Sequence, residues 1–144
     1  MEVYSIGFTQ STAARFFGRL TAAGIKRLLD VRLNNVSQLA GFAKRDDLAY
    51  FLREICGAEY QHEPLLAPTQ NLLDSYKKQK GNWPDYERDF LALLAGRKVE
   101  ELDKGLFAVP TALLCSEPTP EHCHRRLALE YLQEKWGDLE IIHL

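Results

Sequence analysis

The chain has 144 residues, about the length of one ordinary domain, and 46% of them are hydrophobic and 26% charged. This composition excludes a disordered or fibrous protein, and we expect a single domain spanning residues 1–144. The formal net charge is -2, which does not favour nucleic-acid binding by a general basic surface, although a local basic patch stays open.

Three cysteines are an odd number spread over distant positions, so the sequence predicts no disulfide framework and favours a reducing cytoplasm. The first residues lack a basic leader followed by an apolar run, and we expect no signal peptide. No apolar stretch approaches the ~20 residues needed to cross a bilayer, so no membrane association is expected.

Short apolar runs alternate with amphipathic stretches along the first half of the chain. Caps and helix stops are assigned from serine, aspartate and glycine at the ends of these stretches. We expect, in order, a strand over Val3–Gly7, a helix capped by Ser11 and stopped by Gly24, a strand over Lys26–Val31, a loop over Asn34–Gln38, a helix capped by Asp46 or Asp47 and stopped by Gly57, and a strand over Ala58–His62.

The second half continues the alternation after a less regular stretch over 63–82. Proline at a first helical position and glycine after a last one guide the assignments. We expect a helix over Leu72–Lys78 and a basic turn, a helix opened by Trp83, Pro84 and Asp85, an exposed charged segment over 97–105, a buried strand over Pro110–Cys115, a long helix capped by Thr119 with Pro120 first and Gly137 as its stop, and a strand over Leu139–His143.

This alternation predicts an α/β fold. Strands separated by helices form a mostly parallel sheet, here of about five strands, with helices on both faces in three layers. In such a fold, ligands bind in the crevice beyond the carboxyl ends of the strands.

Polar side chains fall at those strand ends. Asp30 and Arg32 end the second predicted strand, two residues apart and so on one side of it, His62 ends the third and His143 the last. An acid and a guanidinium side by side could hold a substrate and take a proton, or simply form an ion pair. His62 and His143 are candidates for substrate binding, but histidines in such places are more often structural.

The densest cluster runs from Cys115 to Arg126 and joins the buried strand to the capped helix. The unpaired N–H groups and positive dipole at the start of that helix, with Arg125 nearby, suit an anion. The same field favours the thiolate of Cys123, which the sequence places in the first helical turn. Cys56 lies at the opposite end of its predicted helix and is expected to be an inert packing residue.

Three interpretations of this cluster stay open. In the first, Cys115 or Cys123 is a nucleophile with His122 or His124 as its base. In the second, the two cysteines, one of these histidines and His62 bind a metal. Because the spacing lacks the C-x2-C pair of structural zinc sites, no metal is predicted.

The third interpretation is structural. Cys115 is a core residue, and Arg125 pairs with Glu117 or Asp30 to join the strand ends to the helix. The aromatic residues of the 83–90 segment are interpreted as core, and the lysines near 77–80 as a solvated face.

The sequence also resembles the bacterial and archaeal family called domain of unknown function 488, over nearly its whole length. The Cys-x-Glu element with the Cys-His-Arg element carries most of the resemblance, and the short Asp-Val-Arg element is shared with rhodanese-like domains. The matching positions are Ser5–Gly7, Leu29–Arg32, Phe42, Tyr60–His62, Trp83–Tyr86, Leu113–Glu117, Cys123–Arg125 and Ile141–His143.

Two positions differ from the pattern of that family. Phe8 stands where the family usually has histidine, and Leu65, Leu66 and Ala67 stand where it often has Leu-Gly-Gly. The first change removes a base or ligand, and the second removes a flexible turn that could approach a phosphate. The resemblance implies an α/β fold and a shared polar site, but no reaction.

The leading hypothesis is an enzyme-like pocket for a small anionic or phosphate-bearing substrate, which includes nucleotides. Arg32 and Arg125 would bind the anion, Asp30 and His124 would handle protons, and a cysteine would act as nucleophile. Glu117 is a further catalytic candidate, and the sequence does not identify a cofactor. The alternative is a non-catalytic module that grips a nucleic-acid end or an acidic partner.

Overall fold

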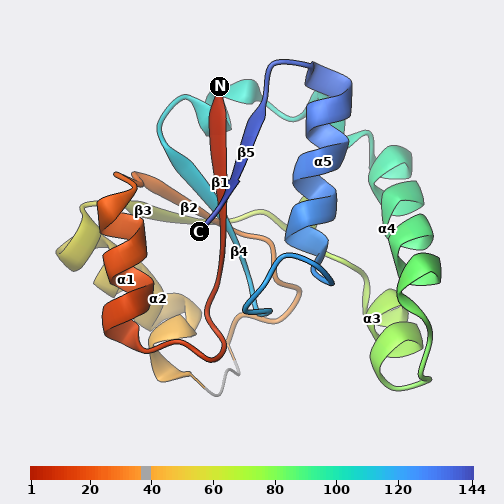
Figure 1. Cartoon of the computed structure of the whole chain (residues 1–144), viewed down its shortest axis with the longest axis horizontal. Coiled ribbons are helices and arrows are strands. Elements are labelled where there is room, and N and C mark those ends of the chain that lie inside the picture. Colours follow the sequence, from red (N-terminus) through yellow and green to blue (C-terminus); the bar gives the residue numbers. More distant parts are fainter. Residues whose placement is uncertain (37–39) are drawn as a thin grey trace.

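The computed structural model describes residues 1–36 and 40–144, and its centre is a five-stranded sheet in which all strand pairs are parallel (Figure 1). The strand order is β3-β2-β4-β1-β5. This confirms the predicted three-layer α/β fold. The strands are β1 (Glu2–Gly7), β2 (Arg27–Asp30), β3 (Glu59–His62), β4 (Thr111–Cys115) and β5 (Glu140–His143).

Helices cover both faces of the sheet. On one face lie α1 (Ala13–Ala22) and α2 (Arg45–Phe51), which continues into a π-helical turn over Leu52–Cys56. On the other face lie α3 (Gln70–Lys77), α4 (Trp83–Arg97) and α5 (His124–Trp136), seen to the right of the sheet in Figure 1. None of the helices in the described ranges is long and apolar enough to span a membrane.

The central strand β4 shows why the sheet is covered twice. All five of its residues are buried. Leu113 and Cys115 belong to the core on the α4–α5 side, whereas Ala112 and Leu114 belong to the core on the α1–α2 side. Successive side chains of a strand point to opposite faces, so a continuous apolar run requires a helical layer on each face.

Several predicted helix ends need correction. Thr12, and not Ser11, caps α1 by accepting from the backbone N–H of Arg15. Lys44 precedes α2 without a side-chain cap, and Asp46 and Asp47 lie in its first turn, where their charges still suit the helix dipole. The predicted glycine stops at Gly24, Gly57 and Gly137 are confirmed by their left-handed backbone.

The start of α5 is the largest error. Its N-cap is Cys123, four residues beyond the predicted Thr119. The preceding segment is held away from the helix because Arg126 donates to the backbone carbonyls of Pro120 and Glu121. Those carbonyls are thereby satisfied without continuing the helix, so the proline signal marks a turn before α5 and not its first residue.

Two less regular segments also differ from expectation. Residues 97–105 are not a purely exposed run, because Val99 is buried and 3-10 turns form over Val99–Glu101 and Lys104–Phe107. The predicted loop over 34–38 lies partly outside the described residues; its part up to residue 36 has no helix or strand.

The strand order reverses between β2 and β4. The chain leaves β2 toward β3 through α2, and leaves β4 toward β5 through α5 on the opposite face. Outgoing loops therefore diverge at this point and open a crevice at the carboxyl edge of the sheet. Gly7 ends β1 beside it, and an added Cβ would lie 1.6 Å from the Glu117 carbonyl oxygen, so this approach requires glycine.

Candidate functional site

A cavity of about 300 Å³ occupies the crevice between the ends of β2 and β4. Five of the residues predicted for the site line it: Arg32, Cys115, Glu117, Cys123 and His124. They come from two strand ends and from the start of α5, which are distant in sequence. Their convergence on one hollow is the geometry that a ligand site at this edge requires.

Asp30 and Arg32 form a buried ion pair at the end of β2. The Asp30 side chain is fully buried and that of Arg32 is 3% exposed. Nε and Nη2 of Arg32 donate to the two carboxylate oxygens at 2.8 and 2.7 Å. The pair is bidentate, which fixes the plane of the guanidinium. Asp30 does not line the cavity, so its position supports the role of holding Arg32 and not that of a proton carrier at the cavity.

The third guanidinium nitrogen of Arg32, Nη1, takes no part in the ion pair with Asp30. Nη1 is buried and has no hydrogen-bond partner within the described residues. Arg32 lines the cavity, and a buried donor without a partner is costly unless a ligand or water satisfies it. Arg32 is therefore prepared to receive an acceptor such as a carboxylate or phosphate oxygen.

Aromatic side chains complete the surroundings of this ion pair. The Tyr60 hydroxyl donates to Asp30 at 2.6 Å, and burial together with this bond raises the pKa of Tyr60. The Arg32 guanidinium lies over the Phe8 ring at 5.2 Å from its centroid. Phe8, which replaces the usual histidine of the resembled family, thus offers a π face to the cation in place of an ionisable ring.

The second position at which the chain differs from the resembled family, the turn over residues 65–67, is packed. Leu66 and Ala67 are buried, and Arg97 Nη1 donates to the carbonyls of Leu65 and Ala67 at 2.8 and 2.7 Å. The turn that glycines would leave flexible is here held by apolar contacts and an arginine. It is therefore not built to approach a phosphate by its backbone.

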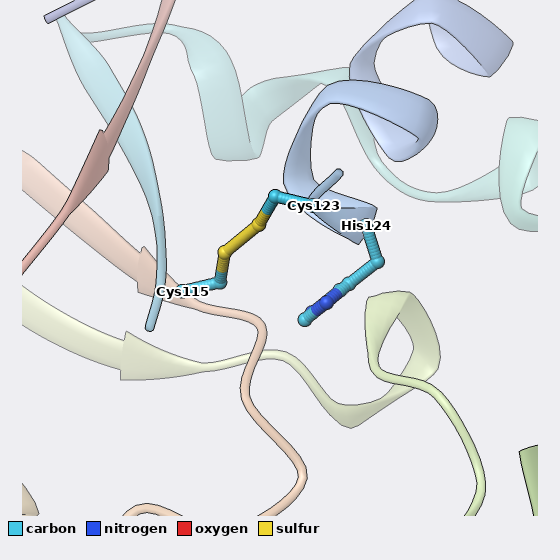
Figure 2. A group of neighbouring side chains, drawn as sticks. All are labelled: Cys115, Cys123 and His124. Carbon is cyan, nitrogen blue, oxygen red and sulfur yellow. A yellow bond between two sulfur atoms is a disulfide. The ribbon is translucent and has the colours of Figure 1, made fainter. Parts of the chain in front are cut away.

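Cys115 and Cys123 are joined as a disulfide, which the sequence analysis did not predict (Figure 2). Cys115 ends β4 and Cys123 caps α5, so the link ties a strand end to a helix start. The odd cysteine is Cys56, which is buried at the far end of the π-helical turn, as expected for a packing residue. An odd number of cysteines argued against a framework of several disulfides, but it did not exclude a single disulfide.

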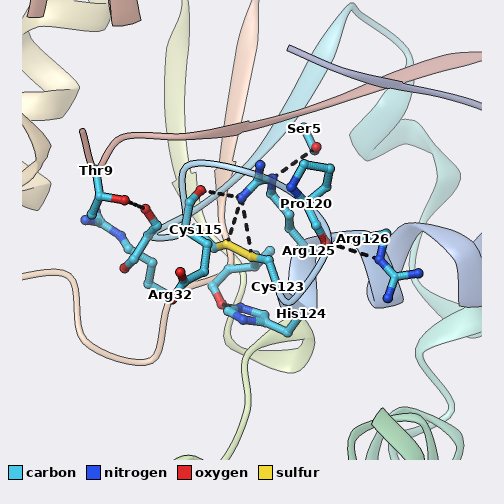
Figure 3. Close-up of a disulfide and its surroundings, with 12 residues drawn as sticks. Ser5, Thr9, Arg32, Cys115, Pro120, Cys123, His124, Arg125 and Arg126 are labelled. Atoms are coloured by element: carbon cyan, nitrogen blue, oxygen red, sulfur yellow. Dashed lines mark hydrogen bonds between the residues drawn. A yellow bond between two sulfur atoms is a disulfide. The ribbon is translucent and has the colours of Figure 1, made fainter. Parts of the chain in front are cut away.

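Arg125 is buried against both sulfur atoms (Figure 3). Its Nη1 lies 3.3 Å from Cys115 Sγ and 3.4 Å from Cys123 Sγ, and donates to the Glu117 backbone carbonyl at 2.7 Å. Nε donates to the Ser5 hydroxyl at 3.1 Å. Burial lowers the pKa of Arg125 to about 10, so it is still charged at neutral pH.

Neither predicted ion pair of Arg125 forms. Asp30 pairs with Arg32, and the Glu117 carboxylate pairs with Lys77 at 3.0 Å. Among the described residues no carboxylate lies within ion-pair distance of Arg125, which is also not among the residues lining the cavity. The buried charge therefore faces the sulfurs, and direct anion binding by Arg125 is not supported.

His124 follows Cys123 and borders the cavity. Its Nε2 lies 2.7 Å from the Val31 backbone carbonyl, which can only accept, so Nε2 carries the proton and Nδ1 is the basic nitrogen. Burial lowers the pKa of His124 to about 4. The ring is thus neutral at neutral pH, with Nδ1 able to accept a hydrogen bond or bind a ligand.

This histidine gives a testable pH dependence. Unfolding frees His124 to take up a proton near its ordinary pKa of about 6.5, whereas the folded protein does so only near 4. Folding stability should therefore fall as pH decreases from 6.5 to 4, by up to about 3 kcal/mol from this group. Urea unfolding measured across this range should show a steeper loss for the native protein than for His124→Gln, which keeps a donor but does not titrate.

His143 should contribute to the same loss, because burial lowers its pKa as well. His143 is present both in the native protein and in His124→Gln, so only the difference between these two proteins reports on His124. Equal slopes for the native protein and His124→Gln would contradict the assignment.

The other two predicted histidines do not line the cavity. His62 Nε2 bonds to the backbone carbonyl of Arg32 at 2.9 Å, and so supports the ion pair from β3. His143 Nδ1 bonds to the Ser5 hydroxyl, on the β5 side of β1. These contacts favour the structural interpretation of both residues over direct substrate binding.

An aromatic wall of the cavity was missed by sequence reasoning. Trp83 and Tyr86 of α4, Tyr76 of α3 and His122 line it, and the rings of Trp83 and His122 stack at 4.8 Å. Trp83 and Tyr86 were interpreted as core because their helical spacing fits packing equally well, and Tyr86 does belong to the buried core while also lining the cavity. The α3–α4 segment extends over the sheet edge, and that placement, which helical spacing does not reveal, turns the rings toward the crevice.

Lysines from the same segment add charge. Lys77 and Lys78, interpreted as a solvated face, line the cavity together with the acidic Asp74 and Glu117. With Arg32, the lining therefore carries more positive than negative groups. A larger hollow of about 870 Å³ between α1 and α2 is lined mostly by apolar side chains and holds none of the predicted site residues.

One group in the described part of the chain has the donors for a metal ion. Cys115, Cys123 and His124 offer ligand atoms that lie within 4.8 Å of one another. The Nε2 bond to Val31 is the kind of contact that orients a metal-binding histidine. The sulfurs are bonded to each other here, however, and thiolates are the metal ligands.

The fold and the cavity together define a three-layer α/β protein with a cavity where the strand order reverses. A family model described as a domain of unknown function, DUF488, matches residues 12–132 of the 144. The match covers most of the chain, and the chain belongs to this family. No curated protein and no solved structure matches it.

Proposed function

We propose that this protein is an enzyme that binds a small anionic substrate in the cavity between β2 and β4 and acts on it through cysteine. The observation that carries the proposal is Arg32, whose Nη1 is buried, without a partner in the described structure, and part of a residue that lines the cavity. Phosphate-bearing molecules, nucleotides included, and carboxylates all supply the acceptor that this donor lacks.

The form of the cavity favours a small molecule. Its volume of about 300 Å³ is at the lower end of the range of ligand pockets. The aromatic wall around Trp83 offers a flat surface for a planar or apolar part of the ligand, opposite the cationic end at Arg32. A nucleic-acid end or an acidic tail, the alternative partners, would need a more open basic surface.

The reactive group would be a cysteine thiol, from the cavity wall that Cys115 and Cys123 form. Cys115 and Cys123 line the cavity beside neutral His124, so a thiol there would have a hydrogen-bond acceptor next to it. We place this activity in a reducing cytoplasm, in which such thiols persist; the low and odd number of cysteines supports that setting. Asp30 would act by positioning Arg32.

Binding can be tested with Arg32→Lys, which keeps the charge beside Asp30 but removes the planar fork. Thermal shifts of the full chain would be measured against phosphate, nucleotides and small carboxylates. A ligand at 100 times its Kd should add about 2.7 kcal/mol of stability. We expect Arg32→Lys to weaken binding of that ligand at least about tenfold, since bidentate sites do not accept lysine in place of arginine.

Arg45→Lys is the matched control. Arg45 also pairs with an aspartate, but on the exposed surface at the start of α2. Its replacement should leave ligand affinity unchanged. The proposal fails if none of the anions shifts the unfolding temperature, or if Arg32→Lys binds as tightly as the native protein.

A further inference from the structure

The disulfide forms part of the cavity wall and yet is almost closed to bulk solvent. Cys115 is 1% exposed and Cys123 2% exposed, and both line the cavity. A protein partner could not reach these sulfurs in the folded chain, whereas a molecule small enough to enter the cavity could. The disulfide is thus placed for a small reactant.

The charge around the sulfurs favours their reduced, ionised form. Arg125 is fully buried, donates to both sulfurs, and has no carboxylate partner among the described residues. Cys123 also caps α5, whose N-terminus is the positive end of a thirteen-residue helix. A cation and a helix N-terminus both stabilise a thiolate over a thiol. After reduction, a thiolate here would supply the counter-ion that Arg125 lacks in the disulfide form.

We propose that Cys115 and Cys123 are a redox-active pair that exchanges with small anionic thiols and disulfides admitted to the cavity. The inference names the substrate class of the proposed function and rests on it for the anionic preference. Arg32 would hold a carboxylate of the reactant, and the sulfur chemistry would take place at the opposite wall.

The reaction is a dithiol–disulfide exchange. The Cys123 thiolate attacks one sulfur of the external disulfide RSSR, whose S–S bond breaks and releases one RS⁻, which takes up a proton. The Cys115 thiolate then attacks Cys123 in the mixed disulfide and releases the second RSH. RSSR is reduced by two electrons to two RSH, and the cysteine pair is oxidised; the reverse reaction oxidises the thiol.

His124 has the position and protonation state to assist. One of its ring nitrogens lies within 4.8 Å of both sulfurs, and its unprotonated Nδ1 can accept a hydrogen bond from a thiol. Cys56, buried near α1 behind the other face of the sheet, is a built-in control because it shares none of these neighbours.

The test uses the reduced full chain with either dithiodiglycolate, which is anionic, or hydroxyethyl disulfide, which is neutral and of similar size. Intact mass after quenching and alkylation reports which thiols remain. We expect one intramolecular disulfide with Cys56 left free, reversal by excess reduced glutathione, and the same behaviour in Cys56→Ser. Cys115→Ser should stop at a mixed disulfide on Cys123.

The anionic reagent should react at least about tenfold faster than the neutral one, and Arg32→Lys should reduce this preference. Equal rates with both reagents would overturn the anionic substrate class, and with it the proposed function, while leaving the redox pair in place. Lack of oxidation by either reagent would overturn the redox pair. So would stoichiometric zinc in the reduced protein that Cys115→Ser loses.

Discussion

Asp30→Asn is expected to destabilise the protein by about 4 kcal/mol, because it leaves the Arg32 charge buried without a counter-ion. Asp30 accepts from Nε and Nη2 of Arg32, from the Arg32 backbone N–H at 3.1 Å and from the Tyr60 hydroxyl. A neutral amide cannot accept all four bonds or balance the charge. Chemical denaturation of both proteins would measure the difference in the free energy of unfolding.

The double variant Asp30→Asn with Arg32→Met separates charge from packing. Removing both charges replaces the buried pair by a neutral side chain and an apolar one, which is often less costly than leaving one charge alone. We expect the double variant to be more stable than Asp30→Asn by at least about 1 kcal/mol. A loss below about 1 kcal/mol for Asp30→Asn would show that the buried pair does not have this structural role.

Arg125→Met is expected to cost less, about 2–3 kcal/mol, because two acceptors lose their donor while a buried charge without a carboxylate partner among the described residues is removed. The arginine satisfies the Ser5 hydroxyl and the Glu117 carbonyl and fills space between β1, β4 and α5. Methionine fills part of that volume but donates no hydrogen bonds, and each buried acceptor left without a donor costs about 1–3 kcal/mol. Thermal and urea unfolding would measure the loss.

Arg88→Met is the matched control on the surface of α4. Arg88 pairs with Asp85 at 3.3 Å, and both side chains are exposed, at 69% and 57%. An ion pair of this kind contributes little to stability. If the two arginine variants lose equal stability, burial of Arg125 between the sheet and α5 does not have the energetic weight assigned to it.

The candidate site could be predicted from the sequence only in part. Arg32, Cys115, Glu117, Cys123 and His124 line the cavity, and each was identified because it follows a strand or precedes a helix in a parallel sheet. Asp30, His62 and Arg125 lie one layer behind and contact these residues. Strand-end position alone cannot separate the two groups, because Asp30 and Arg32 lie two residues apart on one side of the predicted strand and yet only Arg32 lines the cavity.

The disulfide and the aromatic wall could not be predicted for related reasons. Cys115 and Cys123 are eight positions apart in the chain, and the expected helix start at Thr119 put the second cysteine inside a turn and not at the N-cap. The actual start depends on Arg126 contacts that no cap signal reveals. Trp83 has the same helical spacing whether it faces the core or a ligand.

The order of strands and helices, their parallel arrangement and the two apolar faces of the sheet were all determined by local sequence, because hydrophobic periodicity and glycine stops act within a few residues. Tertiary structure alone decided where the strand order reverses, which arginine faces the cavity and which faces the sulfurs. Those outcomes depend on contacts between segments far apart in the chain, such as β1 with β4 and α3–α4 with the start of α5. A buried charge takes its role from the neighbours that folding brings to it.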